Sequence, residues 1–88
     1  MRAIFFGSRF KRDFKKIRNN ARALALVKSA IFVLASEENV PARLREHALG
    51  GKWSGCLECH VAPDLLLVYE KTETTLTLVR LGSHSELF

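Results

Sequence analysis

The sequence is poor in cysteine and has no long hydrophobic run. It contains only two cysteines, too few for the disulfide framework of a small secreted domain. Its longest apolar stretch, residues 23–35, is interrupted by a lysine and a serine and is shorter than the roughly 20 residues that span a bilayer. The apolar residues after Met1 end at Gly7, too soon for a secretion signal. We therefore expect a cytoplasmic protein with free thiols and no contact with a membrane.

Acidic residues are also scarce compared with basic ones. The chain has 9 Asp and Glu against 14 Lys and Arg, which gives a formal net charge of +5 and a sequence pI near 9.7. A basic surface attracts polyanions or acidic proteins, and nucleic acid is the leading class of partner. The length of 88 residues predicts one domain, residues 1–88, with a small core.

The N-terminal half predicts a strand followed by a basic helix. Residues 2–6 are mostly apolar and end at Gly7, and Ser8 is the expected N-cap of the helix. Apolar residues then recur at helical spacing, and basic residues fill the remaining surface. These basic residues form either a solvated face or a face that binds phosphates or an acidic partner segment. They are Arg9, Lys11, Arg12, Lys15, Lys16 and Arg18.

A second, more apolar helix is predicted for residues 21–36. It is rich in Ala, Leu and Val on most of its surface, so we expect it to pack on a broad surface, most simply the face of a sheet. Because Asn19 and Asn20 leave only a short joint, the two helices should form an antiparallel hairpin. Residues 37–52 are punctuated by glycine and proline, which indicates irregular structure.

Three strand-like segments follow. Alternation over residues 53–61 places Cys56, Glu58 and His60 on one face of the first strand and Cys59 on the other. Residues 65–70 are continuously apolar, as expected for a central strand, and residues 75–81 alternate as in a half-buried strand. The order strand, helix, helix and three strands predicts an α+β fold. In it, an antiparallel helical hairpin covers one face of a mostly antiparallel sheet that includes a three-stranded meander.

The segment from Cys56 to His60 matches the C-x-x-C-H pattern of covalent haem attachment. That pattern does not fit here, because haem is attached outside the cytoplasm, the only methionine is Met1, and the segment reads as a strand. A zinc site built from the cysteines and histidines is a further alternative. The predicted strand places its two cysteines on opposite faces, which argues against such a site. We expect no metal and no cofactor.

The three histidines, His47, His60 and His84, together with Asp64 suggest acid–base chemistry on RNA. An imidazole titrates near neutrality and can remove the proton of a ribose 2′-OH or protonate a leaving 5′-oxygen. A nearby carboxylate can orient an imidazole. Arg80, at the end of the last predicted strand, is suited to hold a phosphate.

Four separated blocks of the C-terminal half resemble the YafQ branch of the RelE/ParE toxin superfamily. The blocks are residues 47–49, 51–55, 58–69 and 80–88, in the family order. The N-terminal half agrees only in its layout of a strand and a basic helical hairpin. The resemblance implies a RelE-like α+β fold and a toxin of a type II toxin–antitoxin system that cuts mRNA in the ribosomal A site.

The resemblance also implies site residues and partners. Its catalytic positions fall on His47, His60, Asp64, His84 and the C-terminal aromatic Phe88, which is expected to stack on a base. Family chemistry is the metal-free attack of the 2′-OH on the adjacent phosphate, and the choice between His60, His84 and Asp64 as base is left open. The expected phosphate contacts are Arg80, Lys11, Lys15 and Lys52. The expected partners are the ribosome, mRNA and an antitoxin through which the toxin oligomerises.

The chain departs from the family pattern at Cys56, Leu57 and Leu65, where an aromatic, an arginine and an aromatic are expected. These departures bear on substrate stacking and codon preference and leave the acid–base set intact. Two alternatives remain open at this point. One is a non-enzymatic, ParE-like inhibitor of a protein target, which would not need the histidines, and the other is a Cys/His metal protein.

Overall fold

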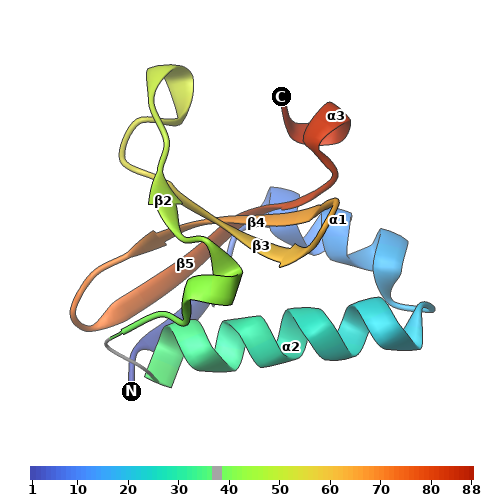
Figure 1. The fold of residues 1–88 in the computed structure, drawn as a ribbon, viewed down its shortest axis with the longest axis horizontal. Helices are drawn as coiled ribbons and strands as arrows, with labels where there is room; N and C mark the ends of the chain where they lie inside the picture. The colour runs from blue at the N-terminus through green and yellow to red at the C-terminus, as the bar shows by residue number, and fades with distance from the viewer. Residues whose placement is uncertain (37–38) are drawn as a thin grey trace.

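Five strands form one sheet, and two long helices pack on one of its faces (Figure 1). The computed structural model describes residues 1–36 and 39–88. Residues 37–38, within the segment predicted to be irregular, lie outside the described part. The described helices include none that is long and apolar enough to cross a membrane. The elements are β1 (Ala3–Phe6), α1 (Ser8–Ile17), α2 (Ala21–Ser36), η1 (Ala42–Leu44), β2 (His47–Ala48), η2 (Gly51–Trp53), β3 (Leu57–Ala62), β4 (Leu65–Lys71), β5 (Thr75–Gly82) and α3 (His84–Leu87).

The strand order is β1-β5-β4-β3-β2, with β1 parallel to β5 and the other pairs antiparallel. This arrangement confirms the predicted α+β class and the meander of the last three strands. The prediction that the first meander strand starts at Trp53 is wrong. The strand starts at Leu57, because η2 and Gly55, whose φ is +94°, turn the chain before it. The short strand β2 is an addition that the irregular segment did not predict.

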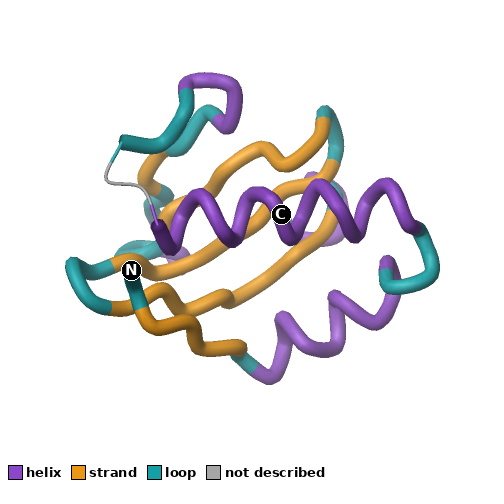
Figure 2. Tube along the Cα trace, turned by 90° about the horizontal axis from the view of Figure 1, so that it is seen from below, coloured by secondary structure: helices purple, strands orange, loops and turns teal. Residues whose placement is uncertain are grey.

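The two helices begin close to where the sequence predicts. The N-cap of α1 is Gly7 and not Ser8, which is the first helical residue. At Gly7 a Cβ atom would lie 2.8 Å from the carbonyl oxygen of Leu78, so a larger residue would collide with β5. The side chain of Asn20 accepts a hydrogen bond from the N–H of Ala23 and caps α2. The chain turns back between α1 and α2, but the helices diverge from this joint (Figure 2).

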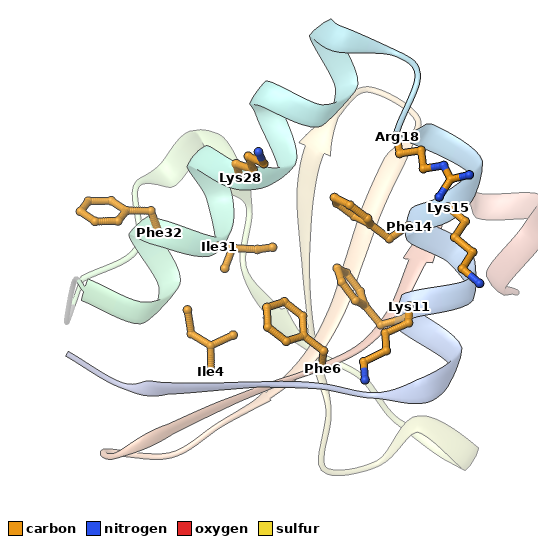
Figure 3. A pocket seen from close by; sticks show the side chains of 10 residues that line it. Ile4, Phe6, Lys11, Phe14, Lys15, Arg18, Lys28, Ile31 and Phe32 are labelled. Atoms are coloured by element: carbon orange, nitrogen blue, oxygen red, sulfur yellow. The ribbon is translucent and has the colours of Figure 1, made fainter.

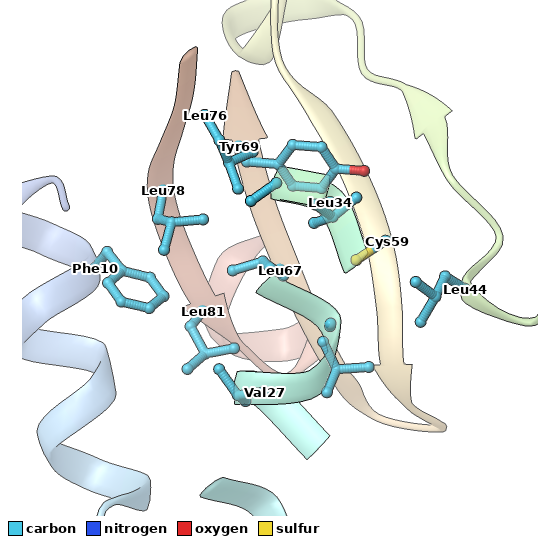
Figure 4. Close-up of a cluster of buried hydrophobic side chains, with 13 residues drawn as sticks. Phe10, Val27, Leu34, Leu44, Cys59, Leu67, Tyr69, Leu76, Leu78 and Leu81 are labelled. Carbon is cyan, nitrogen blue, oxygen red and sulfur yellow. The ribbon is translucent and has the colours of Figure 1, made fainter. Parts of the chain in front are cut away.

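The main core lies between α2 and the sheet (Figure 4). Val27 and Leu34 of α2 are fully buried, as are Leu67 and Tyr69 of β4. On the opposite face, Leu66 and Val68 of β4 pack with Leu87 of α3 in a smaller cluster. Strand β4 is therefore buried on both sides, as its continuous apolar sequence predicts. We call the face that carries the helices the helix face and the opposite one the outer face.

A buried ion pair ties α1 to β5. The Asp13 carboxylate accepts hydrogen bonds from Arg80 Nε at 2.7 Å, from Arg80 Nη2 at 3.2 Å and from the Leu81 N–H at 2.9 Å. Burial alone would raise the pKa of Asp13, but the bonds from Arg80 and Leu81 outweigh burial and hold that pKa below its usual range. The same pairing raises the pKa of Arg80.

Replacing Asp13 with alanine should lower the free energy of unfolding by about 2 to 3 kcal/mol at pH 7, because it leaves a mostly buried guanidinium without its partner. The folded-state pKa of Asp13 lies below its unfolded value. The stabilisation by the Asp13–Arg80 ion pair is therefore complete above about pH 4 and is lost as pH falls through the folded-state pKa of Asp13. Urea unfolding of Asp13→Ala and wild type at pH 7 and pH 3 should show a large difference at pH 7 and a smaller one at pH 3. The exposed Glu73 provides the control variant Glu73→Gln, which should stay within about 0.5 kcal/mol of wild type.

Candidate active site

Strand β3 presents Glu58 and His60 on the outer face, as its alternation predicts. Cys59 points the other way and is fully buried in the main core. Burial raises the pKa of the Cys59 thiol to about 12 and also raises that of Cys56, so neither thiol is ionised near neutral pH. Cys56 packs in the cluster on the outer face. The two cysteines thus lie on opposite faces and do not assemble with the histidines as a metal-ligand set.

His47, Glu58 and His60 form one polar cluster, which we call the β3 cluster. His47 of β2 pairs with Glu58 in the sheet register, and its Nε2 lies 3.2 Å from Glu58 Oε1. His60 Nε2 lies 3.8 Å from the same oxygen. The Glu58 side chain is only 4% exposed, while those of His47 and His60 are 49% and 21% exposed. A buried carboxylate therefore faces two imidazoles that solvent, and hence a substrate, can reach.

A backbone turn before β2 orients the ring of His47. Arg45 has φ 53° and ψ 47°, in the left-handed region that non-glycine residues rarely adopt. Its carbonyl oxygen accepts a hydrogen bond from His47 Nδ1 at 2.9 Å. Both ring nitrogens of His47 thus face oxygen atoms, Arg45 O and Glu58 Oε1, and these two contacts fix the orientation of the ring.

Glu46, which lies between Arg45 and His47, anchors this turn to the core. Glu46 accepts hydrogen bonds from the Tyr69 hydroxyl at 2.5 Å and from Lys71 Nζ at 2.7 Å. Burial, followed by the bond to Glu46, raises the pKa of Tyr69, so its hydroxyl stays protonated and keeps donating. Two residues of β4 therefore hold the segment that carries His47.

Asp64 and His84 meet at the other end of the outer face. Asp64 Oδ1, in the turn between β3 and β4, accepts a hydrogen bond from the backbone N–H of His84 at 3.1 Å. His84 is the first residue of α3, whose N-cap Ser83 forms a capping box with Glu86. The bonds from Ser83 lower the pKa of Glu86 and keep it ionised. Asp64 and the capping box together fix the backbone from which the His84 ring projects.

Phe88 lies beside His84, and Trp53 lies beside Phe88. The ring of Phe88 lies 5.6 Å from that of His84 and 6.1 Å from that of Trp53, in an edge-on arrangement with Trp53. Phe88 is 51% exposed. The buried Nε1 of Trp53 has no hydrogen-bond partner among the described residues. These rings offer a stacking surface for a base, and Trp53 belongs to a block that carries the family resemblance.

The β3 cluster and His84 flank the end of β4. His60 pairs across to Leu66, and Leu66 pairs across to Gly82, two residues before His84. Two strand spacings, about 10 Å, therefore separate the backbone at His60 from the end of β5. Leu66 lies between them and is fully buried.

The predicted basic residues do not all join this site. Arg80 is engaged by Asp13, and its role in phosphate binding stays a prediction. Lys11 and Lys15 line a groove between α1, α2 and β1 (Figure 3), away from the histidines, and their predicted contacts with RNA also stay untested. Lys52 is exposed in η2, beside Trp53.

Sequence reasoning placed Glu58 on the correct face but assigned it no role. The signal was present, since Glu58 is an acid between two core-facing residues, two positions before His60 and therefore on the same face of the strand. It also missed Arg43 and Arg45, which line a cleft of about 600 Å³ with His60 and Pro63. Nothing in the local sequence distinguishes these two arginines from the other basic residues.

Comparisons with known proteins agree with this geometry. Residues 2–88 match the family model described as the bacterial toxin of type II toxin–antitoxin system, YafQ. The mRNA interferase toxin YafQ of Escherichia coli K12 is 30% identical over 99% of this chain and 96% of its own length.

Solved structures show the same fold. A metal-bound toxin from Helicobacter pylori is 42% identical, with full coverage of both chains and a TM-score of 0.87. The Escherichia coli DinJ–YafQ toxin–antitoxin complex contains a chain that is 30% identical, with a TM-score of 0.87 over 99% of this chain and 97% of that one. A fold and sequence match of this extent defines a bacterial toxin of the type II toxin–antitoxin class. Within that class, the chain belongs to the YafQ family.

Proposed function

We propose that this toxin is a ribosome-dependent mRNA endoribonuclease that uses general acid–base catalysis. The observation that carries the proposal is the β3 cluster, in which a buried carboxylate lies between two accessible imidazoles on the same face as His84. The full-length relative named as an mRNA interferase supports the substrate class. A ParE-like inhibitor of a protein target would need none of these groups.

In the proposed mechanism, the scissile phosphate lies between the β3 cluster and His84, outside the apolar cluster that covers Leu66. The His60 imidazole accepts the proton of the 2′-OH, and the Glu58 carboxylate stabilises the imidazolium that forms. The 2′-oxygen then bonds to phosphorus as the bond to the 5′-oxygen breaks. His84 gives its proton to that oxygen, which leaves a 2′,3′-cyclic phosphate and a 5′-hydroxyl end.

The remaining residues assist this step. Asp64 holds the backbone of His84, and His47 places positive charge beside the phosphate. Phe88 stacks on a base next to the cleaved bond. Lys52 contacts phosphates of mRNA or rRNA, and Arg43 and Arg45 extend this contact beside His60. The contacts of Arg80 support a positioning role at the end of β5.

The β3 cluster also has the composition of a metal site. The ligand atoms of His47, Glu58 and His60 lie within 4.8 Å of one another, and nitrogen and carboxylate donors suit Cu²⁺ or Zn²⁺. Metal-bound and copper-bound relatives from Helicobacter pylori have this fold. A metal held there would occupy the imidazole lone pairs that proton transfer needs. We therefore propose that cleavage itself requires no metal.

The test is to incubate the purified protein with translating ribosomes, with and without a chelator that leaves magnesium in place, and to map the new mRNA 5′ ends. Cleavage within codons in the A site, unchanged by the chelator, is expected. Binding to ribosomes should weaken steeply as salt rises, because phosphate contacts release counterions. Absence of cleavage on translating ribosomes would contradict the proposal, and a metal requirement would contradict its metal-free form.

The antitoxin is the second proposed partner. The Escherichia coli complex shows that a YafQ-family toxin assembles with its antitoxin, and we propose that this chain binds a cognate antitoxin and oligomerises through it. Activity on ribosomes implies that the toxin works in the cytoplasm.

A further inference from the structure

The cleft of about 600 Å³ beside His60 has the form of a binding site for one unit of a larger ligand. Two arginines, Arg43 and Arg45, line it, and Leu26, Leu44 and Pro63 supply apolar surface. Its volume falls within the range of about 300 to 1,000 Å³ that is usual for sites of small organic ligands. We call it the arginine cleft.

The cleft exists because β2 is short. Strand β2 pairs with β3 only at Leu57 and Glu58, so residues 59–62 of β3 have no neighbour on that side among the described strands. The turn η1 lies against β3 instead (Figure 1). Leu44 of η1 is 3% exposed and packs in the main core. Because Leu44 points inwards, its neighbours Arg43 and Arg45 remain on the surface at the cleft.

The two guanidinium groups are available to an anion. Within residues 1–36 and 39–88, no salt bridge joins Arg43 or Arg45 to an acidic side chain. A guanidinium presents a planar fork of N–H donors that matches the oxygens of a phosphate. Two such forks beside an apolar surface are complementary to a nucleotide, which joins a phosphate to a sugar and a base.

Arg45 links the arginine cleft to the β3 cluster. Its backbone has the left-handed φ of 53°, a conformation that is costly for a side chain of this size and that is concentrated at functional sites. In this conformation its carbonyl oxygen holds His47 Nδ1, while its side chain lines the cleft. His60 belongs to both places, since it lines the cleft and contacts Glu58. The cleft is therefore continuous with the site of proton transfer.

The chemistry of the cleaved bond gives the mRNA a direction across this surface. In the proposed mechanism, His60 takes the proton of the 2′-OH, which belongs to the nucleotide on the 5′ side of the bond. His84 protonates the 5′-oxygen of the following nucleotide. The arginine cleft adjoins His60, whereas Phe88 adjoins His84. The two places therefore serve nucleotides on opposite sides of the cleaved bond.

We infer that the arginine cleft binds the mRNA nucleotide on the 5′ side of the cleaved bond, with Arg43 and Arg45 on the phosphate that precedes it. The strand then runs from the cleft, past His60, to Phe88. This inference rests on the proposed function and adds a binding site and a direction to it. Because phosphate contacts position a strand without reading its sequence, the cleft acts on every codon.

The test measures binding to ribosomes whose A-site codon lacks its 2′-hydroxyl groups, so that the mRNA is bound but not cut. A methylphosphonate, which carries no charge, replaces each phosphate of this codon in turn. At the phosphate that precedes the 5′ nucleotide, the replacement should weaken binding of the wild-type toxin by about tenfold, the size of one charge-assisted contact.

The variant Arg43→Gln with Arg45→Gln should already bind the unmodified mRNA about tenfold more weakly. The same methylphosphonate should weaken it no further, because the contact is already lost. At the other positions, the variant and the wild type should lose affinity by equal factors. Both residues are exposed, so the variant should unfold at the wild-type denaturant concentration.

Arg9→Gln with Arg12→Gln is the matched control. It removes the same two charges from the exposed surface of α1, and neither residue lines the cleft. Whatever its own affinity for ribosomes, this variant should respond to each methylphosphonate as wild type does.

Each outcome separates one explanation from the others. Equal losses for the cleft variant and wild type at every phosphate would overturn the inference and show that the arginines do not contact the codon. A shared contact on the 3′ side of the cut would overturn the direction of the strand. A toxin that shows the expected contact but does not cleave unmodified mRNA would contradict only the proposed function, because binding in the cleft is measured without cleavage.

Discussion

Replacing His84 with alanine should reduce mRNA cleavage by about 10² to 10⁴-fold, the contribution of a positioned general acid. His84 projects from the first residue of α3, whose backbone is held by Asp64 and the capping box. In the proposed mechanism no other group on that side of the phosphate supplies the proton to the leaving 5′-oxygen. The measurement is the rate of mRNA cleavage on translating ribosomes at saturating toxin.

The neighbouring Ser85 provides the matched control, because it is also an exposed residue of α3. Ser85→Ala should cleave at the wild-type rate, and both variants should unfold at the wild-type denaturant concentration. Growth inhibition should follow the same pattern in cells. If His84→Ala cleaves within about twofold of wild type, far less than a general acid contributes, the proton comes from another group and the assignment is wrong.

Replacing Glu58 with glutamine should cost about 10²-fold in cleavage rate, although the side chain keeps its size. Glu58 is 4% exposed and faces His47 and His60 through one oxygen. The amide can still occupy the space but cannot stabilise an imidazolium. The substitution should therefore slow proton transfer to His60 and also weaken the stabilisation of charge at His47, and both effects lower the cleavage rate.

Glu70→Gln is the control for the loss of one negative charge, because Glu70 is exposed on the neighbouring strand β4. It should leave the rate unchanged. The imidazole nitrogen signals of His47 and His60 in an NMR spectrum provide a readout that is independent of cleavage. They should shift in Glu58→Gln and not in Glu70→Gln. Equal rates for Glu58→Gln and wild type would remove the β3 cluster from the mechanism.

Local patterns predicted the parts of the site that depend on strand geometry alone. The period of two along β3 correctly separated Glu58 and His60 from Cys59, because successive side chains of a strand alternate between faces. The apolar run of β4 correctly predicted a strand buried on both sides. The four sequence blocks correctly identified the family. Each of these conclusions uses neighbouring residues or a fixed spacing.

Contacts between distant segments were not predictable from such patterns. Asp13 and Arg80 are 67 residues apart, and a single aspartate among the basic residues of α1 carries no sign of its partner. Strand β2 has only two residues, too few to show a period. The contact of His47 with Glu58 depends on that pairing. The divergence of α1 and α2 depends on distant contacts too, because α1 packs on β5 whereas α2 packs on β3 and β5.

The parallel pairing of β1 with β5 also orders events during synthesis. Ala3 pairs with Thr75, so the first strand leaves the ribosome about 70 residues before its partner. Because synthesis adds about 5 to 20 residues per second, β1 and its phenylalanines remain unpaired in the nascent chain for several seconds. The sheet cannot close, and His84 cannot reach its place, until β5 has emerged. A cell that makes this toxin thus has an interval of several seconds in which β1 has been made but the sheet of the growing polypeptide is still incomplete.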